Sequence, residues 1–145
     1  MAIDKMTKQQ RLEVLSKETG IIQGIIKRKS TDSFLIKGWT VTLIVATLIL
    51  QGEKFQVLVA FIPLLSFWFL DAHYQQQISL YKKLYKWDIV NRLNTEDYLF
   101  DMNAKGRFKD QVPSRPQHMI ADKLISFYGA MIILTFVYLA CAVYR

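Results

Sequence analysis

The longest uncharged stretch of the sequence constrains the fold most strongly. Residues 124–144 form a run of 21 residues without a charge, and as an α-helix this run is about 31 Å long. That length matches the hydrocarbon core of a bilayer, which is about 30 Å thick. Two shorter apolar runs occur earlier, at 34–50 with one charge and at 55–70 with none. We therefore expect an all-α integral membrane protein with three transmembrane helices. A buried helical hairpin in a soluble protein is the alternative for the shorter runs, but little else in the chain could cover so much apolar surface.

The polar segments complete a predicted organisation of four regions. Residues 1–33 have apolar side chains at helical spacing, which predicts an amphipathic helix bound to lipid headgroups or to another subunit. The polar residues from Ser30 to Ser33 predict a break with N-cap side chains before the transmembrane hairpin 34–71. Residues 72–123 are expected to extend the second span into the cytoplasm to about residue 93 and then to form a loop. The third transmembrane helix occupies 124–145.

The net charge of +7 is explained by membrane topology. Among the Lys and Arg residues, only Lys54 and Arg145 fall outside residues 1–37 and the 72–123 connection. Basic residues remain on the cytoplasmic side of a membrane. We therefore predict a bacterial inner membrane protein with its N-terminus in the cytoplasm and its C-terminus outside. Membrane lipid is the expected binding partner, rather than nucleic acid.

The sequence contains no recognisable catalytic or metal-binding pattern. Its single cysteine excludes an intrachain disulfide, and its two histidines leave too few ligands for the usual kind of zinc site made by protein alone. A nucleophile with a base, paired carboxylates and a phosphate-binding loop do not occur at recognisable spacing. We therefore predict a protein that is not an enzyme and that has no metal or cofactor.

Two charges at the ends of predicted spans form a candidate functional pair. Folding the hairpin about the turn Gln51–Lys54 places Lys37 opposite roughly residue 68, so Asp71 lies about 4.5 Å further along. A lysine side chain spans that offset. Charges near hydrocarbon persist when they are paired or face water. The pair therefore either locks the hairpin or belongs to a ring around an aqueous opening.

Aromatic and basic side chains mark the predicted cytoplasmic boundary. Trp39 and Trp68 fall at nearly the same depth, and Tyr74 and Tyr81 continue along the second helix, so these four are expected to anchor at the interface. Such a stripe can also stack nucleic-acid bases, but an interfacial helix or a subunit contact is favoured. The apolar cluster in the following loop either packs against the cytoplasmic helices or docks a partner. The candidate partner contacts are Lys82, Lys83, Lys86, Phe100 and Met102.

Two motif runs carry a resemblance to a known group. Residues 33–39 (SFLIKGW) and 67–74 (FWFLDAHY) resemble the SFxxKGW and FWxLDxxY signatures of a widespread group of uncharacterised small three-span bacterial membrane proteins. The layout is also similar to the SLATT-type antiphage membrane effectors. The resemblance implies a membrane-perturbing effector or channel in antiphage defence. Its activating partner would be a cytoplasmic sensor protein or a small signalling ligand.

Small polar residues in the spans favour assembly with further copies of the chain. Thr40, Thr42 and Thr47 in the first span and Ser66 in the second offer surfaces for close helix contacts, so a homo-oligomer is expected. The alternative function is a passive membrane anchor that scaffolds a soluble cytoplasmic partner. A nucleic-acid-binding protein tethered to the membrane is the least favoured reading.

Overall fold

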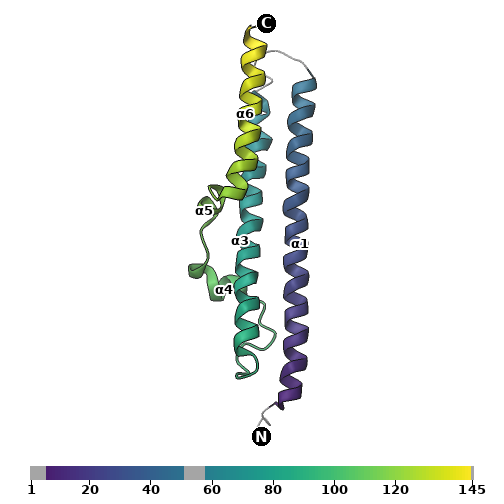
Figure 1. Ribbon diagram of the computed structural model, residues 1–145, viewed down its shortest axis with the longest axis vertical. Coiled ribbons are helices and arrows are strands. Elements are labelled where there is room, and N and C mark those ends of the chain that lie inside the picture. The colour runs from purple at the N-terminus through teal and green to yellow at the C-terminus, as the bar shows by residue number, and fades with distance from the viewer. Residues whose placement is uncertain (1–5, 51–57, 145) are drawn as a thin grey trace. The chain divides into compact units, whose positions relative to one another are not determined.

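The computed structural model describes residues 6–50 and 58–144, and the regular elements within them are all helical. The long helices are α1 (Lys8–Ile49), α3 (Phe61–Asn91) and α6 (Asp122–Tyr144). Three short elements lie between α3 and α6 (Figure 1): α4 (Ala104–Phe108), the 3-10 helix η1 (Lys109–Gln111) and α5 (Arg115–Met119). The predicted all-α class is confirmed.

Among the residues that the structure describes, two helices are long and apolar enough to span a membrane. They are α1 and, over the range Asp122–Cys141, α6. The predicted second span, 55–70, begins outside the described residues, and the predicted turn at Gln51–Lys54 lies there entirely. From Phe61 onward this region is helical as part of α3, which ends at Asn91, close to the predicted end near residue 93.

A continuous helix replaces the predicted break before the first span. α1 runs through Ser30–Ser33 without interruption, so the predicted N-cap and hinge at this place are wrong. The Ser33 hydroxyl is buried and donates a hydrogen bond of 2.5 Å to Asp71 Oδ1 in α3. Because the Ser33 hydroxyl bonds to a residue of another helix, it does not cap a helix start at this position.

The predicted loop at 94–117 contains more helix than expected. Asn103 caps α4, its Oδ1 accepting from the Gly106 N–H at 2.9 Å. α5 begins with a capping box in which the Gln117 side chain accepts from the Ser114 backbone N–H at 2.7 Å. Such caps supply partners for the backbone N–H groups that a helix start leaves unpaired. They explain how five-residue helices form in this segment.

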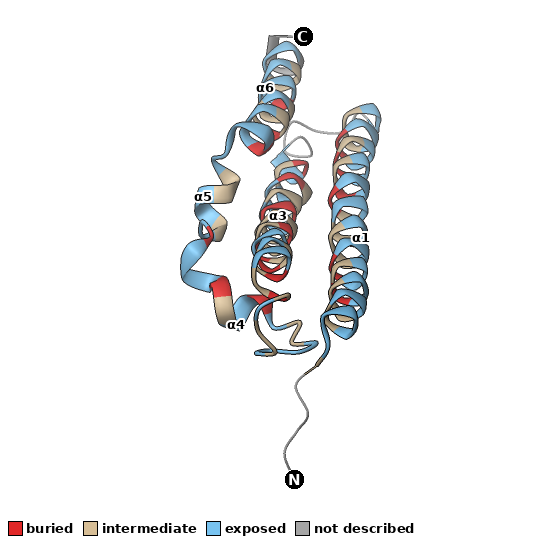
Figure 2. Ribbon diagram, turned by 60° about the horizontal axis from the view of Figure 1, so that its bottom comes forward, coloured by how far each residue is buried: buried red, intermediate tan, exposed pale blue. Residues whose placement is uncertain are grey.

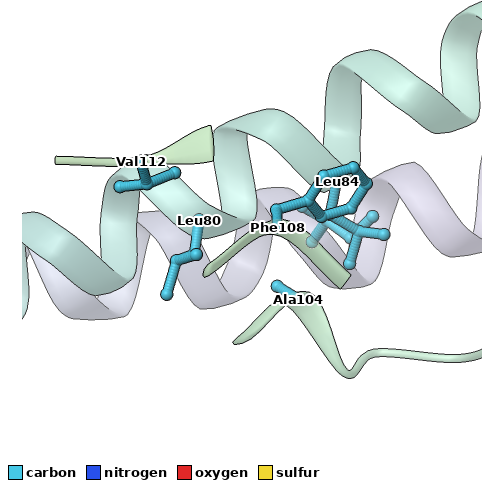
Figure 3. Packing of buried hydrophobic residues seen from close by; sticks show 6 residues of the cluster. Leu80, Leu84, Ala104, Phe108 and Val112 are labelled. Atoms are coloured by element: carbon cyan, nitrogen blue, oxygen red, sulfur yellow. The ribbon is translucent and has the colours of Figure 1, made fainter. Parts of the chain in front are cut away.

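The chain divides into two compact units, and each takes one half of α1 and one half of α3. The first unit comprises residues 1–30 and 77–112, and the second comprises 31–76 and 113–145. The buried positions of α1 recur along one side of that helix (Figure 2). The core of the first unit is formed by Ile22, Leu80, Leu84, Ala104, Phe108 and Val112 (Figure 3).

The second unit has an apolar core and an apolar exterior. Its buried core is formed by Ile44, Leu64, Ala72, Leu124 and Tyr128. Large apolar side chains also point outward on all three of its long helices; Phe34 is 74%, Ile62 66% and Ile133 65% exposed. Soluble monomers rarely expose apolar patches of this extent. The second unit therefore has the surface expected of a segment that contacts lipid or further protein.

Candidate functional site

The candidate site is a buried ion pair in the second unit. Lys37 on α1 and Asp71 on α3 lie with Nζ and Oδ2 2.5 Å apart, as the hairpin geometry predicts. The Asp71 side chain is fully buried, whereas the Lys37 side chain keeps 24% of its surface exposed. A buried charge is tolerated when it is paired and hydrogen-bonded. The Lys37 ammonium group therefore compensates the charge of the Asp71 carboxylate, and part of the Lys37 side chain stays exposed at the surface of the unit.

Two further side chains, Ser33 and Gln75, extend the hydrogen-bond network of the ion pair. Ser33 lies one turn before Lys37 on α1, and its Oγ accepts from Lys37 Nζ at 3.0 Å while donating to Asp71 Oδ1. Gln75, one turn after Asp71 on α3, donates from Nε2 to Ser33 Oγ at 2.9 Å. Residues four apart share one face of a helix. The two helix faces therefore interlock through four polar side chains.

The third long helix joins the same carboxylate. Tyr128 on α6 is fully buried, and its hydroxyl lies 3.1 Å from Asp71 Oδ2 and 3.3 Å from the Phe67 carbonyl oxygen. Its ring stacks on Trp68 with centroids 5.7 Å apart. Asp71 thus contacts hydroxyl or ammonium groups from both other long helices. It is the one side chain in the described network to which α1 and α6 both donate.

The predicted interface anchors occupy different environments. Trp39 is 60% exposed on α1, whereas Trp68 is partly buried and donates from Nε1 to the Met119 carbonyl oxygen at 3.1 Å. Tyr74 and Tyr81 are half-buried on α3, and Tyr81 packs against the core of the first unit. The structure therefore does not place the two tryptophans in equivalent positions. Their role as membrane anchors stays a prediction.

The predicted partner contacts are exposed with one exception. Lys82, Lys83 and Lys86 are exposed on α3, and Phe100 is 48% exposed. Met102 packs instead against the core of the first unit. Of the two roles considered for the loop cluster, packing therefore describes Met102, while Phe100 is still available to a partner.

A second charge network, in the first unit, was not predicted. Arg92, the residue directly after α3, pairs with Glu18 on α1, and both side chains are 1% exposed. Arg92 Nε and Nη2 lie 2.5 and 3.0 Å from the Glu18 carboxylate oxygens. Asp88, one turn before Arg92, lies 3.6 Å from its Nη2. Bidentate Arg–carboxylate pairs are among the stronger polar contacts in proteins. One sequence signal was available: Glu18 lies four residues before Ile22, on the face of α1 that was expected to be apolar.

The Glu18–Arg92 pair also holds the segment after α3. Arg92 donates to the carbonyl oxygens of Asp97 at 2.7 Å and Tyr98 at 3.1 Å. Glu18 Oε1 accepts from the Phe100 backbone N–H at 2.6 Å. Each charged group therefore satisfies backbone groups as well as its partner, which is the usual condition for burying an ion pair.

Comparison with known proteins returned no match: no family model, curated protein or solved structure matches the chain. Within the described residues there is no group of three or more His, Cys, Asp or Glu side chains that could hold a metal ion. The chemistry available at the site is that of charge pairing and hydrogen bonding. Such an arrangement can hold helices together and can release them when a charge is lost.

Proposed function

We propose that the protein is a homo-oligomeric integral membrane protein that acts as a membrane-perturbing effector or channel. The second unit lies in the bilayer with three spans, and the first unit lies in the cytoplasm. The observation that carries the proposal is the buried Lys37–Asp71 pair inside a unit whose long helices expose large apolar side chains. Ionisable residues within membrane spans are rare, and they usually mark functional sites.

The distribution of charge supports this placement. Most Lys and Arg residues of the chain belong to the first unit; the second unit has only Lys37, Lys54, Arg115, Lys123 and Arg145. The positive-inside rule assigns the basic unit to the cytoplasm. The same rule gives the orientation proposed here for a bacterial inner membrane, with the C-terminus outside.

In this proposal the Asp71 network is the lock of the membrane unit. Asp71 receives Lys37 from α1 and Tyr128 from α6, so loss of its charge loosens contacts of both helices at once. Lys37 is the partly exposed member of the pair and is the group that water or lipid headgroups reach first. The network therefore holds the spans in the arrangement that perturbs the membrane, and this arrangement is lost when the pair is broken.

In this proposal several copies of the chain together enclose the aqueous path that one copy cannot form. Three spans are too few to enclose an aqueous path, and pores are formed by rings of identical subunits in many small channels. The α1 residues Gly38, Thr42 and Ala46 are exposed at four-residue spacing. Small residues at this spacing allow close helix contacts in membranes.

A role in antiviral defence is supported only by the resemblance to SLATT-type effectors in the sequence. It predicts that cells carrying the gene together with its genomic neighbours reduce phage plating, and that the Asp71→Ala variant does not. Equal plating on both strains would remove the defence role and leave the membrane activity to be tested separately.

Membrane depolarisation of expressing cells tests the proposed activity. Wild-type protein is expected to depolarise the cells and slow growth, whereas Lys37→Ala and Asp71→Ala abolish both effects. The double variant Lys37→Asp with Asp71→Lys restores the pair with exchanged charges and is expected to recover part of the activity. Lys105→Ala, which changes an exposed lysine of the first unit outside the candidate partner contacts, is the matched control. Absence of leakage from reconstituted wild-type vesicles, under every condition tried, would contradict the proposal.

The alternative function is a membrane anchor that scaffolds a soluble partner. The exposed apolar side chains of Tyr98, Leu99 and Phe100, at 57%, 40% and 48%, favour it because contiguous exposed apolar groups mark interaction sites. Co-purification of one cytosolic protein at equal stoichiometry, lost in Phe100→Ser, together with tight vesicles, would establish the scaffold in place of the effector.

A further inference from the structure

The segment between α3 and α4 has a strained backbone. Tyr98 and Phe100 have φ angles of 57° and 54°, and they are the non-glycine residues with positive φ in the part of the chain that the structure describes. Side chains with a Cβ atom are unfavourable in this region, and aromatic residues gain no local hydrogen bond there. Such conformations persist where the surroundings hold them.

The buried Glu18–Arg92 pair supplies the holding contacts. Arg92 donates to the carbonyl oxygens of Asp97 and Tyr98, and Glu18 accepts from the Phe100 N–H. These bonds fix the backbone on both sides of Tyr98 and on the N-terminal side of Phe100. Glu18 is 74 positions from Arg92 in the sequence, so the segment is held by α1 together with the residue that follows α3.

Two buried polar atoms beside the Glu18–Arg92 pair destabilise the observed conformation of this segment. Asp88 Oδ1 and Arg107 Nη1 have no hydrogen-bond partner among the described residues, which leaves part of their desolvation uncompensated. The groups that face Asp88 are Glu18 from α1, Arg92 from just after the end of α3 and Arg107 from α4. The Arg107 guanidinium lies over the rings of Trp87 and Tyr98, 4.1 and 4.2 Å from their centroids.

We propose that residues 97–101 form a strained latch, which the Glu18–Arg92 pair holds shut and which the buried carboxylate of Asp88 keeps close to opening. When the latch opens, Tyr98 leaves Arg107 and both unpartnered atoms reach water. The inference concerns the first unit alone and goes beyond the proposed membrane activity. It gives that unit a two-state element on which an activating signal can act.

The sign of the pH dependence follows from burial. Desolvation, followed by the neighbouring charge of Glu18, raises the pKa of Asp88 to about 6. In the open latch the carboxyl is hydrated and its pKa returns toward the ordinary value of 3.8. Protons are therefore bound more tightly by the closed latch, so acid closes it and neutral pH loosens it.

Hydrogen exchange of the full chain in detergent micelles, read at the Phe100 and Asp101 amides, tests the latch. These amides donate to Glu18 and to the Tyr98 carbonyl oxygen, so both are protected only when it is closed. At pH 7.5 Asp88→Asn is expected to slow exchange by about tenfold or more, and Glu18→Gln to accelerate it by about tenfold. After correction for intrinsic rates, wild-type protection is higher at pH 5.5 than at pH 7.5.

The controls separate a latch from general loosening. Asp110→Asn changes an exposed acid of the same unit and leaves exchange unaltered. Phe100→Gly relieves the strained φ angle and slows exchange at Asp101. The proposal is overturned if Asp88→Asn accelerates exchange, because Asp88 then supports the closed state. It is also overturned if Glu18→Gln leaves the Phe100 amide fully protected. Neither result bears on vesicle leakage, so failure of the latch and failure of the membrane activity are distinguishable.

Discussion

Two aspartates on α3 differ in how completely their buried charge is balanced. Asp71 receives hydrogen bonds from Ser33, Lys37 and Tyr128, so both of its oxygens are satisfied. Asp88 lies near Arg92 but keeps one oxygen without a hydrogen bond among the described residues. A carboxylate with several donors stabilises the fold as an anion, whereas one that is buried without them favours the protonated form. Replacing Asp71 by an uncharged residue is therefore expected to lower the free energy of unfolding, whereas replacing Asp88 is expected to raise it.

Replacing Asp88 by Asn is expected to stabilise the protein at pH 8. The pKa of Asp88 is about 6 against an ordinary value of 3.8, so its favourable contribution is complete below pH 3.8 and is lost as the pH rises through 6. Because Asn does not ionise, the free energy of unfolding of the variant is expected to exceed that of wild type by about 2–3 kcal/mol at pH 8. Thermal unfolding in detergent, followed by circular dichroism at pH 8 and pH 4, measures the difference. A variant that melts below wild type at pH 8 would refute the assignment.

At the scale of single helices, the helical periodicity and the length of the apolar runs were enough to predict where the long helices lie in the sequence. The apolar run 124–144 and the continuation of the second span past Asp71 correspond to α6 and to α3. The break at Ser30–Ser33 was wrong because the partner of Ser33 lies 38 residues away. The Glu18–Arg92 pair was missed for the same reason. Local patterns do not contain contacts between distant helices.

A glycine pair on different helices tests how local contacts set helix stability. A Cβ atom at Gly106 would lie 2.5 Å from Asn103 Nδ2, the residue that caps α4, so Gly106→Ala is expected to disturb the cap and cost about 1 kcal/mol. Gly24 has no atom within 4 Å of such a Cβ, and Gly24→Ala in the exposed face of α1 is expected to gain up to about 1 kcal/mol. Melting temperatures that shift in the same direction for both variants would contradict this account.

Continuity of α1 is tested by proline at Ser30. Ser30 is exposed within the helix, and Ser30→Pro removes a backbone donor there, at a cost of about 3 kcal/mol or more. Ser30→Ala keeps the helix and is the matched control. Circular dichroism and thermal unfolding are expected to show lower helicity and stability for the proline variant alone. If proline is tolerated as well as alanine, a hinge exists at this position after all.

At the scale of the whole molecule, most Lys and Arg residues belong to the first unit, and the most exposed large apolar side chains belong to the second. The first unit has two buried ion pairs and an apolar core of its own. The second unit exposes large apolar side chains on every long helix. A surface rich in charged residues is stable in water, whereas strongly exposed large apolar side chains are more stable in contact with lipid or protein. The proposed topology follows from this separation together with the distribution of basic residues.

Chemical labelling can show on which side of the membrane the first unit lies. Cys141 is the single cysteine of the chain, so a Cys141→Ala background carrying Leu99→Cys reports only on the loop, where Leu99 is 40% exposed. A membrane-impermeant maleimide is expected to label this residue after the cells are permeabilised and not before. Labelling in intact spheroplasts would place the loop outside and reverse the proposed orientation.

The central claim is that lipid surrounds the second unit, and extraction of membranes at alkaline pH tests it most directly. Carbonate washes remove peripheral proteins but leave membrane-spanning helices in place, because the apolar surface of a span is far more stable in hydrocarbon than in water. The account predicts that the full-length chain stays in the carbonate-washed membrane pellet and dissolves only in detergent. Recovery of the chain in the soluble fraction, folded and without detergent, would contradict it.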